Sequence, residues 1–383
     1  MQLGSSRSRR LAMGGLLALA VAMGIGRFVY TPILPAMAAG LGLSTAQAGL
    51  IASANFLGYL VGAIAASTPR LPGSRRAWLI GALVMSALTT GVMAAVEAVP
   101  AFLAVRFMGG AASAFVMVFA SSLVLERLAG AGRPELAAVH FAGVGSGIAV
   151  SALLVGILSD ADWRLLWLAS GAAALVMIPV IASFVPPDAG GARAAASTTP
   201  LSLTRPLLAL IVAYGLFGFG YVITATFLVA IVREAPELRS IEPFVWLAVG
   251  LAAAPSVLLW NGIGRRLGVV PAFALACLVE AVGVALSVLA TGALGVLLAA
   301  VFLGGTFMAI TALGLVGARA LSTSDPRQII ALMTAAFGAG QIVGPVLAGL
   351  MVDGSGSFTL PTLIAAAALV TAAFLSLVAR ARG

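Results

Sequence analysis

Long apolar runs dominate this chain, and they restrict its fold more than any other feature. The first run continues from Leu11 to about Ala39, which is long enough to cross a bilayer core about 30 Å thick. Because lipid offers no hydrogen-bond partners, a backbone can cross it only as helices or as a closed barrel. The runs lack the ten-residue alternation that is typical of outer-membrane barrel strands. The sequence therefore predicts an all-α integral membrane protein.

Composition supports the membrane assignment and removes several classes of protein. The chain is 62% hydrophobic and 9% charged, with a mean hydropathy of +1.15, whereas soluble domains are about 25% charged. The net charge of +9 comes from arginines in short segments between the runs, which indicates membrane topology and no nucleic-acid partner. All 21 basic residues are arginines, so a Walker-A lysine and a Schiff-base lysine are excluded. Cys277 is the only cysteine, and we expect no internal disulfide, no metal site and no cofactor.

The runs predict twelve spans with both ends of the chain in the cytoplasm. Sixteen arginines then face the cytoplasm and three face outward, while Arg27 and Arg106 lie within spans. This bias follows the positive-inside rule and predicts a multi-pass protein of a bacterial-type cytoplasmic (inner) membrane. The predicted spans are roughly 11–39, 45–67, 77–96, 99–128, 134–158, 163–185, 205–232, 244–263, 269–291, 293–320, 327–352 and 357–379.

The longest polar connection, 186–204, is rich in Pro, Gly, Ser and Ala, as flexible linkers are. We expect it to separate an N-terminal six-helix bundle (1–185) from a C-terminal six-helix bundle (205–383). The two halves are internal repeats, as glycine motifs that recur at offsets of 193, 194 and 195 residues indicate: Gly145 with Gly338, Gly26 with Gly220, and Gly109 with Gly304. In proteins with such parallel repeats, the binding site lies between the two halves, near the membrane midplane.

Four segments carry a resemblance to a known family. They are Gly24-Ile-Gly-Arg27-Phe-Val-Tyr-Thr-Pro-Ile-Leu-Pro35, Arg106-Phe-Met-Gly109-Gly110, Tyr214-Gly-Leu-Phe-Gly-Phe-Gly-Tyr221-Val-Ile-Thr224 and Phe302-Leu-Gly-Gly-Thr306-Phe. Together they resemble the major facilitator superfamily of transporters, in its YbfB/YjiJ-like branch, over nearly the whole chain. The resemblance implies two pseudo-symmetric six-helix bundles and alternating access, with spans 1, 4, 7 and 10 lining the cavity.

The chain departs from the superfamily in the loop between spans 2 and 3, which usually carries Gly-x-x-x-Asp-Arg-x-Gly-Arg. Here only Gly73, Arg75 and Arg76 remain of that pattern, and the acidic residue is absent. The Asp latch that the resemblance implies is therefore in doubt. The neighbouring residues Glu126 and Arg127 are expected to form an ion pair at the cytoplasmic end of span 4.

Arg27 and Arg106 are the principal candidates for a binding site. A guanidinium within a span costs at least about 2.5–3.5 kcal/mol on insertion scales, so each must face a protein interior or a wet cavity. Tyr30 follows Arg27 by three residues and is expected on the same helical face, while Pro32 and Pro35 should bend the outer end of the span. Two buried guanidiniums would suit a carboxylate, sulfonate or phosphate. The alternative is that each arginine binds backbone carbonyls and only holds spans together.

Further polar residues within spans form a second layer of candidates. A buried hydroxyl or amide needs a partner, which could be a solute or another helix, and both readings stay open. These residues are Asn55 and Tyr59 in span 2, Tyr214, Tyr221 and Thr224 in span 7, Thr306 in span 10 and Gln341 in span 11.

Glu280 and His140 are candidates for proton coupling. Glu280 is the one carboxylate placed inside a predicted span, and its alternatives are a protonated or snorkelling structural residue. His140 can titrate near neutral pH, although a histidine at a helix end is usually solvated. The segments Gly143-x-Gly145-x-Gly147 and Gly338-x-Gly340 are similar to nucleotide-binding loops but follow no strand, so they predict close helix packing.

We therefore expect a secondary active or facilitative transporter of a small anionic organic solute. Its partners would be that solute, a coupling proton or counter-anion, and the lipid bilayer, and the chain would act as a monomer. An exporter of drugs or sugars is an alternative with the same fold, and a non-transporting receptor or scaffold is another. The chain has no Gly-x-Ser-x-Gly, no His-Glu-x-x-His and no paired carboxylates within spans, so we expect no enzyme.

Overall fold

The structure is a computed structural model that describes residues 5–68, 71–187, 202–322 and 325–380, and this part of the chain is all helical. Short helical turns at Ala20–Ile25, Met93–Ala95, Pro134–Leu136 and Pro236–Ile241 join or precede longer helices. The longer helices are α1 (Ser5–Leu19), α2 (Tyr30–Leu41), α3 (Thr45–Ala66), α4 (Arg75–Val92), α5 (Val99–Gly130), α6 (Ala137–Ile157), α7 (Trp163–Phe184), α8 (Arg205–Glu234), α9 (Glu242–Leu267), α10 (Val269–Leu289), α11 (Ala293–Ala320), α12 (Pro326–Ser355) and α13 (Thr359–Arg380).

Twelve segments of the described chain are long and apolar enough to span a membrane, which confirms the predicted number. The first segment, Ser6–Leu41, contains both α1 and α2. The helix α1 begins at Ser5, before the predicted start at Leu11. The apolar run in the sequence does not include this extension, because its turns carry arginines. One of them, Arg10, packs over the ring of Phe184 at 4.8 Å.

The described residues separate into two compact units. One contains residues 5–43, 54–68, 71–187 and 246–255, and the other contains 44–53, 202–245, 256–322 and 325–380. Two helices are divided between the units, since α3 contributes residues 45–53 to the second and α9 contributes Trp246–Pro255 to the first. The expected boundary at 186–204 stays a prediction, and its residues 188–201 lie outside the described chain.

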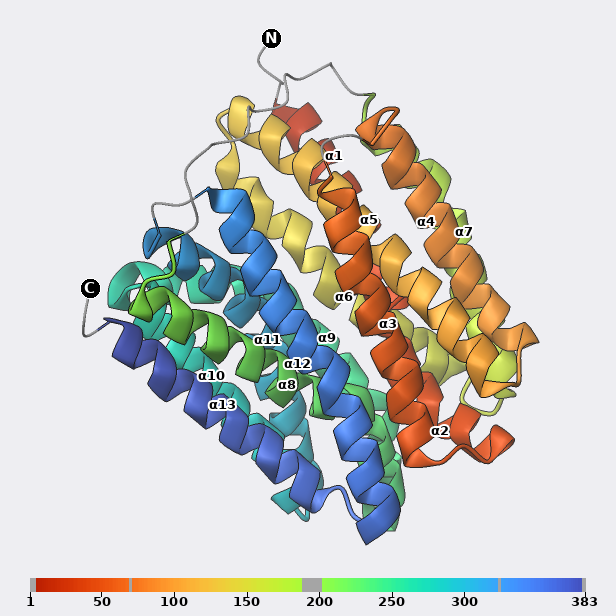
Figure 1. Cartoon of the computed structure of the whole chain (residues 1–383). Coiled ribbons are helices and arrows are strands. Elements are labelled where there is room, and N and C mark those ends of the chain that lie inside the picture. The colour runs from red at the N-terminus through yellow and green to blue at the C-terminus, as the bar shows by residue number, and fades with distance from the viewer. Residues whose placement is uncertain (1–4, 69–70, 188–201, 323–324, 381–383) are drawn as a thin grey trace. The chain divides into compact units, whose positions relative to one another are not determined.

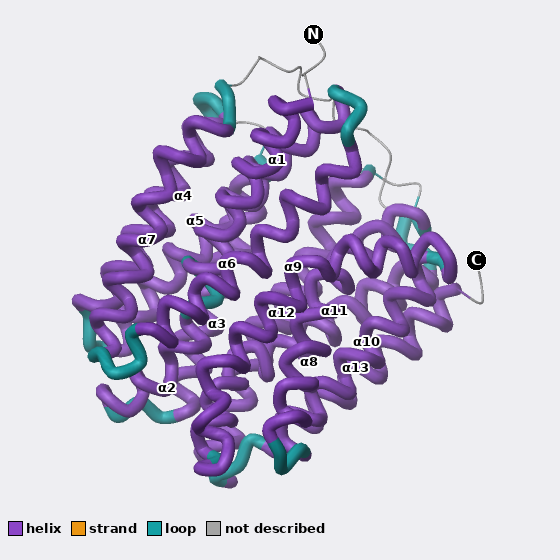
Figure 2. The backbone as a smooth tube through the Cα atoms, turned by 180° about the vertical axis from the view of Figure 1, so that it is seen from behind, coloured by secondary structure: helices purple, strands orange, loops and turns teal. Residues whose placement is uncertain are grey.

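In the second unit, α8 packs against both α12 and α13 (Figure 1). The same unit has α10 beside α13, as the view from behind also shows (Figure 2). Gly340 of α12 explains one of these close contacts, because a Cβ added there would lie 2.2 Å from the carbonyl oxygen of Gly215 in α8. Small residues let membrane helices approach until backbone atoms touch. The predicted packing role of the Gly338-x-Gly340 segment is thus confirmed.

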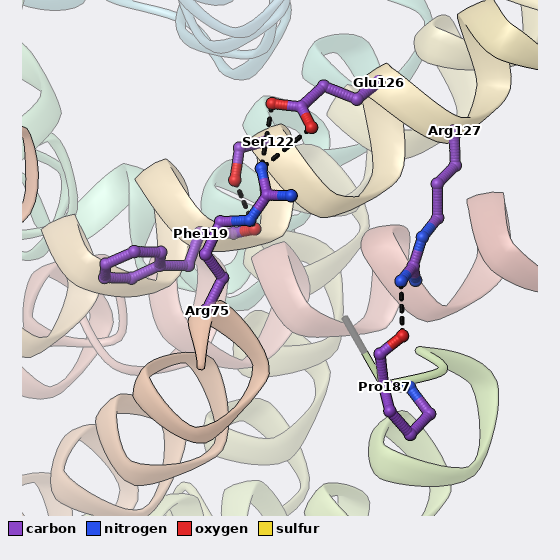
Figure 3. A network of polar contacts seen from close by, with 6 residues as sticks. All are labelled: Arg75, Phe119, Ser122, Glu126, Arg127 and Pro187. Carbon is purple, nitrogen blue, oxygen red and sulfur yellow. Dashed lines mark hydrogen bonds and ion pairs between the residues drawn. The ribbon is translucent and has the colours of Figure 1, made fainter. Parts of the chain in front are cut away.

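Arginines in the first unit tie together the ends of α4, α5 and α7. Arg75 at the start of α4 pairs with Glu126 of α5 at 2.8 Å, as Figure 3 shows. Arg76 donates to the carbonyls of Ala182 and Val185, both at 2.8 Å, and so caps the C-terminal end of α7. The remnant of the span 2–3 pattern therefore connects three helices without the missing acid.

The expected ion pair between Glu126 and Arg127 is wrong. Glu126 binds Arg75, and Arg127 donates to the carbonyl of Pro187 at 2.5 Å (Figure 3). Arg127 also donates to the carbonyl of Pro186 at 3.0 Å. Consecutive residues on a helix point in different directions, so neighbours in sequence do not face each other. Glu126 therefore reaches α4, while Arg127 reaches the segment that follows α7.

Asp353 near the end of α12 caps the first turn of α3 within the second unit. Its two carboxylate oxygens accept hydrogen bonds from the backbone N–H groups of Thr45 at 2.9 Å and Ala46 at 3.0 Å. We expect Asp353→Ala to lower the unfolding free energy by about 0.5–2 kcal/mol, the usual effect of losing a helix cap. Thermal unfolding in detergent measures this loss. Asp160→Ala is the control, because Asp160 is the repeat counterpart and makes no hydrogen bond within the described residues. Equal melting of the two variants would contradict the capping role.

Candidate functional site at a break in the first span

The first membrane span is interrupted at its centre. After α1 the chain forms a π-helical turn, Ala20–Ile25, and residues 26–29 then form turns before α2 begins at Tyr30. Two backbone hydrogen bonds join residues five positions apart, as in a π-helix. The N–H of Gly26 donates to the carbonyl of Val21 at 2.8 Å, and the N–H of Phe28 donates to the carbonyl of Met23 at 3.1 Å.

The prolines of this span contribute to the distortion. Pro32 and Pro35 lie in α2, and the bend that they were expected to cause at the outer end stays a prediction. A proline in a helix cannot donate to the carbonyl four residues earlier and presses against it. For Pro32 that carbonyl belongs to Phe28, which accepts from Thr31 at 3.3 Å instead. The distortion therefore appears one turn before the proline.

Arg106 of α5 clamps the broken segment. Its Nη1 donates to the carbonyl of Gly26 at 3.3 Å and its Nη2 to the carbonyl of Arg27 at 3.2 Å. The guanidinium lies 4.9 Å from the ring of Tyr30 and 6.0 Å from that of Trp167, and the residue is only 4% exposed. Non-helical backbone inside a membrane persists only where other groups satisfy it, and Arg106 supplies two of the donors here.

Arg27 lies on the broken segment itself, and three aromatic rings surround its guanidinium. The ring of Tyr59 is 4.3 Å away, that of Phe56 is 4.8 Å away and that of Phe28 is 5.5 Å away. Ring faces attract a cation, and the attraction grows where water is excluded. Arg27 is 4% exposed in this conformation, so it lies in the protein interior and not in a water-filled cavity, which was the other expected surrounding.

The positive charges of Arg27 and Arg106 lie close enough to repel each other. Like charges at a buried position destabilise the fold unless other contacts hold them. The aromatic rings and backbone carbonyls described above provide such contacts. A negatively charged ligand would offset the repulsion further.

Three buried N–H groups of the first unit lack a partner. Within the described residues, Arg106 Nε, Trp167 Nε1 and Trp246 Nε1 have no hydrogen-bond acceptor. Trp167 packs against Tyr30, with ring centres 6.3 Å apart, and Trp246 packs against Phe28 at 6.5 Å. An unpaired buried N–H group is costly, so each of the three could bind an acceptor-rich group that reached it.

The remaining predicted residue of this region, Asn55, supports Arg106 from behind. Its Nδ2 donates to the backbone carbonyl of Arg106 at 2.9 Å, and its Oδ1 has no partner within the described chain. Tyr30 lies beside the guanidinium of Arg106, with its ring centre 4.9 Å away. Five predicted residues are thus brought together in the first unit: Arg27, Tyr30, Asn55, Tyr59 and Arg106.

The other predicted residues lie in the second unit. Gln341 donates to the hydroxyl of Tyr221, whose ring stacks on Phe307 and Phe337 at interplanar angles of 5° and 2°. Tyr214 donates to the carbonyl of Thr311 at 3.1 Å. Thr306 bonds within its own helix, and the hydroxyl of Thr224 is buried without a partner among the described residues. Their role as solute contacts stays a prediction.

His140 lies in the first unit and is fully buried, so the expectation of a solvated helix end is wrong for it. Its Nε2 is 3.1 Å from the hydroxyl of Ser121 on α5. A Cβ on Gly15 of α1 would lie 2.3 Å from its Nδ1, so the ring packs directly on that helix. Pattern reasoning places a histidine near a helix end but cannot see that neighbouring helices enclose it.

Sequence reasoning missed the aromatic side chains of the site: Phe56, Trp167 and Trp246. Phe56 precedes Tyr59 by three residues on α3, and this spacing could have indicated a shared face. Trp167 and Trp246 carried no local signal. Their contribution depends on contacts between helices that are distant in sequence.

Twelve candidate spans and the similarity to solved structures define a polytopic membrane protein of the major facilitator fold. The chain belongs to the family described as "Uncharacterised MFS-type transporter YbfB", whose model matches residues 19–377. The resemblance seen in the sequence is therefore confirmed, as is the expectation that the chain is no enzyme. No curated protein sequence matches it.

Solved structures show the same fold at low sequence identity. A point mutant of the nucleoside transporter NupG is 16% identical with a TM-score of 0.75, covering 96% of this chain and 99% of that one. A second structure of NupG gives a TM-score of 0.72 at 16% identity, covering 98% and 100%. A bacterial homolog of the human lysosomal transporter Spinster, inward-facing and unoccupied, gives 0.68 at 13% identity, covering 99% and 96%.

Proposed function

We propose that this chain moves a small anionic organic solute across the membrane by alternating access, and that Arg27 binds the anionic group. The observation that carries the proposal is the pair of buried guanidiniums in the first unit, together with the N–H groups of Arg106, Trp167 and Trp246 that are buried without an acceptor among the described residues. Carboxylate, sulfonate and phosphate oxygens are strong acceptors, and arginine binds them through two parallel N–H groups.

The two arginines have different roles in this proposal. Both terminal nitrogens of Arg106 donate to backbone carbonyls, so Arg106 is a positioning residue that holds the segment carrying Arg27. Arg27 packs against the ring faces of Phe56 and Tyr59, which attract a cation. Since Arg27 is 4% exposed here, the solute enters in another conformation of the transport cycle.

The orientation and location also belong to the proposal. We place both termini in the cytoplasm of a bacterial-type inner membrane, and the bundles 1–185 and 205–383 on either side of the 186–204 linker. The excess of arginines in the segments assigned to the cytoplasm supports this orientation. Reporter fusions at the two ends, read on each side of the membrane, test it.

A thermal-shift screen of organic carboxylates, sulfonates and phosphates on the purified protein tests the solute class. We expect anions to raise the melting temperature of the wild type, because a ligand that binds only the folded state stabilises it. Arg27→Ala should lose this shift, and Trp246→Phe, which keeps a ring but removes the unpaired N–H, should weaken it.

Matched controls separate binding from general damage. Arg76→Ala removes an arginine that also donates to backbone carbonyls, and Trp260→Phe removes an indole that donates to Gly305 at 2.8 Å. Both should keep the anion shift despite any loss of stability. An Arg27→Ala protein that responds to the same anions at unchanged concentrations would refute the proposed site. Uptake and counterflow in liposomes then distinguish a transporter from a receptor.

A further inference from the structure

Glu280 is a fully buried carboxyl group halfway along α10 in the second unit. Neither of its oxygens has a geometrically acceptable hydrogen bond within the described chain. Its side chain is 0% exposed, so it reaches neither lipid headgroups nor water, and the snorkelling alternative is excluded. The residue faces neighbouring helices instead.

The groups around Glu280 offer it no positive charge. The side chain of Thr306 on α11 lies near it, and Cys277 is one turn away on α10. The helices α8, α11 and α13 pack against α10. Their charged residues lie only in their first or last turns: Arg205, Arg233 and Glu234 in α8, Arg319 in α11 and Arg380 in α13.

Thr306 does not donate to the carboxyl in this conformation. Its hydroxyl donates to the carbonyl of Phe302 at 2.5 Å, with Leu303 at 3.3 Å. The lone pairs of that hydroxyl remain able to accept a hydrogen bond. An ionised carboxylate has nothing here to accept from, whereas a carboxylic acid can donate to Thr306.

We propose that Glu280 is a proton-binding site whose occupancy is coupled to transport. In the present conformation the site is occupied, and the carboxyl group of Glu280 is neutral. When a later conformation admits water, the acid transfers its proton to a water molecule and leaves a carboxylate and a hydronium ion. The Thr306 hydroxyl then turns from Phe302 to the carboxylate, which is the only strong acceptor newly available to it.

The position of Thr306 connects this switch to the polar cluster of the second unit. The next residue, Phe307, stacks on Tyr221 with ring centres 5.8 Å apart, and Tyr221 accepts from Gln341. The bond from Thr306 to Phe302 joins a side chain to the carbonyl four residues earlier, and such bonds bend helices, so its loss changes the geometry of α11 at the turn that carries Phe307. Proton release therefore alters the packing around Tyr221.

Infrared difference spectroscopy on the purified, solute-free protein measures the proton directly, through the C=O stretching band of a protonated carboxyl. We expect the band in the wild type at neutral pH, its reversible loss as the pH is raised, and its absence in Glu280→Gln. Cys277→Ser is the matched control, since Cys277 is equally buried one turn away, and it should keep the band. Should Glu280→Gln fail to fold, Glu280→Asp should move the band instead of removing it.

Two infrared results would overturn the proposal. Absence of the band in the wild type would show an ionised residue. If the band stayed constant over the whole pH range in which the protein is folded, Glu280 would be a permanently neutral, structural residue. Neither result depends on which solute is carried.

The coupling step rests on the proposed function and is tested separately. Liposomes loaded with a pH-sensitive dye receive an inward gradient of the anion that gives the largest thermal shift. Wild type and Cys277→Ser should move protons with the anion, whereas Glu280→Gln should lower proton movement at least tenfold and keep anion counterflow. Unchanged proton movement in Glu280→Gln would refute the coupling. If no anion shifts the melting of the wild type, the solute proposal fails while the infrared test of Glu280 still decides the proton site.

Discussion

Replacing Gly147 by alanine should abolish most of the folded protein. A Cβ at this position would lie 2.3 Å from the carbonyl oxygen of Ala20 and 2.6 Å from its Cα, where the π-helical turn of the first span crosses α6. Both obstructing atoms belong to backbone and cannot rotate away. Overpacking usually costs about 1–3 kcal/mol, and a clash between two backbones belongs at the upper end. The yield of monodisperse protein and its melting temperature measure the effect.

Gly81→Ala is the matched control for this substitution. Gly81 also lies within a helix of the first unit, but a Cβ there meets nothing within 4 Å. Alanine should stabilise that helix by up to about 1 kcal/mol, because glycine is the poorer helix former. If Gly147→Ala melted like Gly81→Ala, the close crossing of the π-helical turn and α6 would be wrong.

Replacing Arg106 by alanine should be the second most damaging change. It removes two hydrogen bonds from a charged donor, each worth about 1.5–3 kcal/mol, and leaves the carbonyls of Gly26 and Arg27 without them. Bonds between membrane helices are usually weaker, so we expect a total loss of about 2–4 kcal/mol. The stability of Arg106→Lys should lie between that of the wild type and that of Arg106→Ala, because one ammonium group cannot bind both carbonyls as the planar guanidinium does.

The same variants distinguish a clamp from a direct solute contact. A clamp predicts that Arg106→Ala lowers both the melting temperature and the anion response. A direct contact predicts a lost anion response at unchanged melting temperature, and that result would move Arg106 into the solute site. Arg164→Ala is the control, since Arg164 pairs with Glu97 at an exposed position and should change neither quantity by much.

The sequence was sufficient for the fold, because the length and spacing of apolar runs depend only on the bilayer. It also placed Arg27 inside the protein, since the cost of exposing a guanidinium to lipid leaves no other choice. It could not show what Arg106 binds. Its partners are backbone carbonyls made available by a break nearly eighty positions away, and no side-chain pattern records an available carbonyl.

The location of the break was missed for a related reason. Two prolines were visible, yet the carbonyl that a proline disrupts lies one turn earlier, and the outcome depends on whether another helix can bind the groups released. The aromatic rings around Arg27 and the enclosure of His140 likewise arise from contacts between distant helices. The partners of Glu126 and Arg127 were wrong because adjacency along a helix separates side chains instead of joining them.

The interrupted first span also has a mechanical consequence. A continuous helix tilts as one rod, so displacement at one end is transmitted to the other. Here α1 is followed by the π-helical turn Ala20–Ile25 and the turn residues 26–29, where Arg106 of α5 binds the carbonyls of Gly26 and Arg27. A π-helical turn is a point at which a helix can change direction. We therefore expect a displacement of α1 to reach α2 only in part.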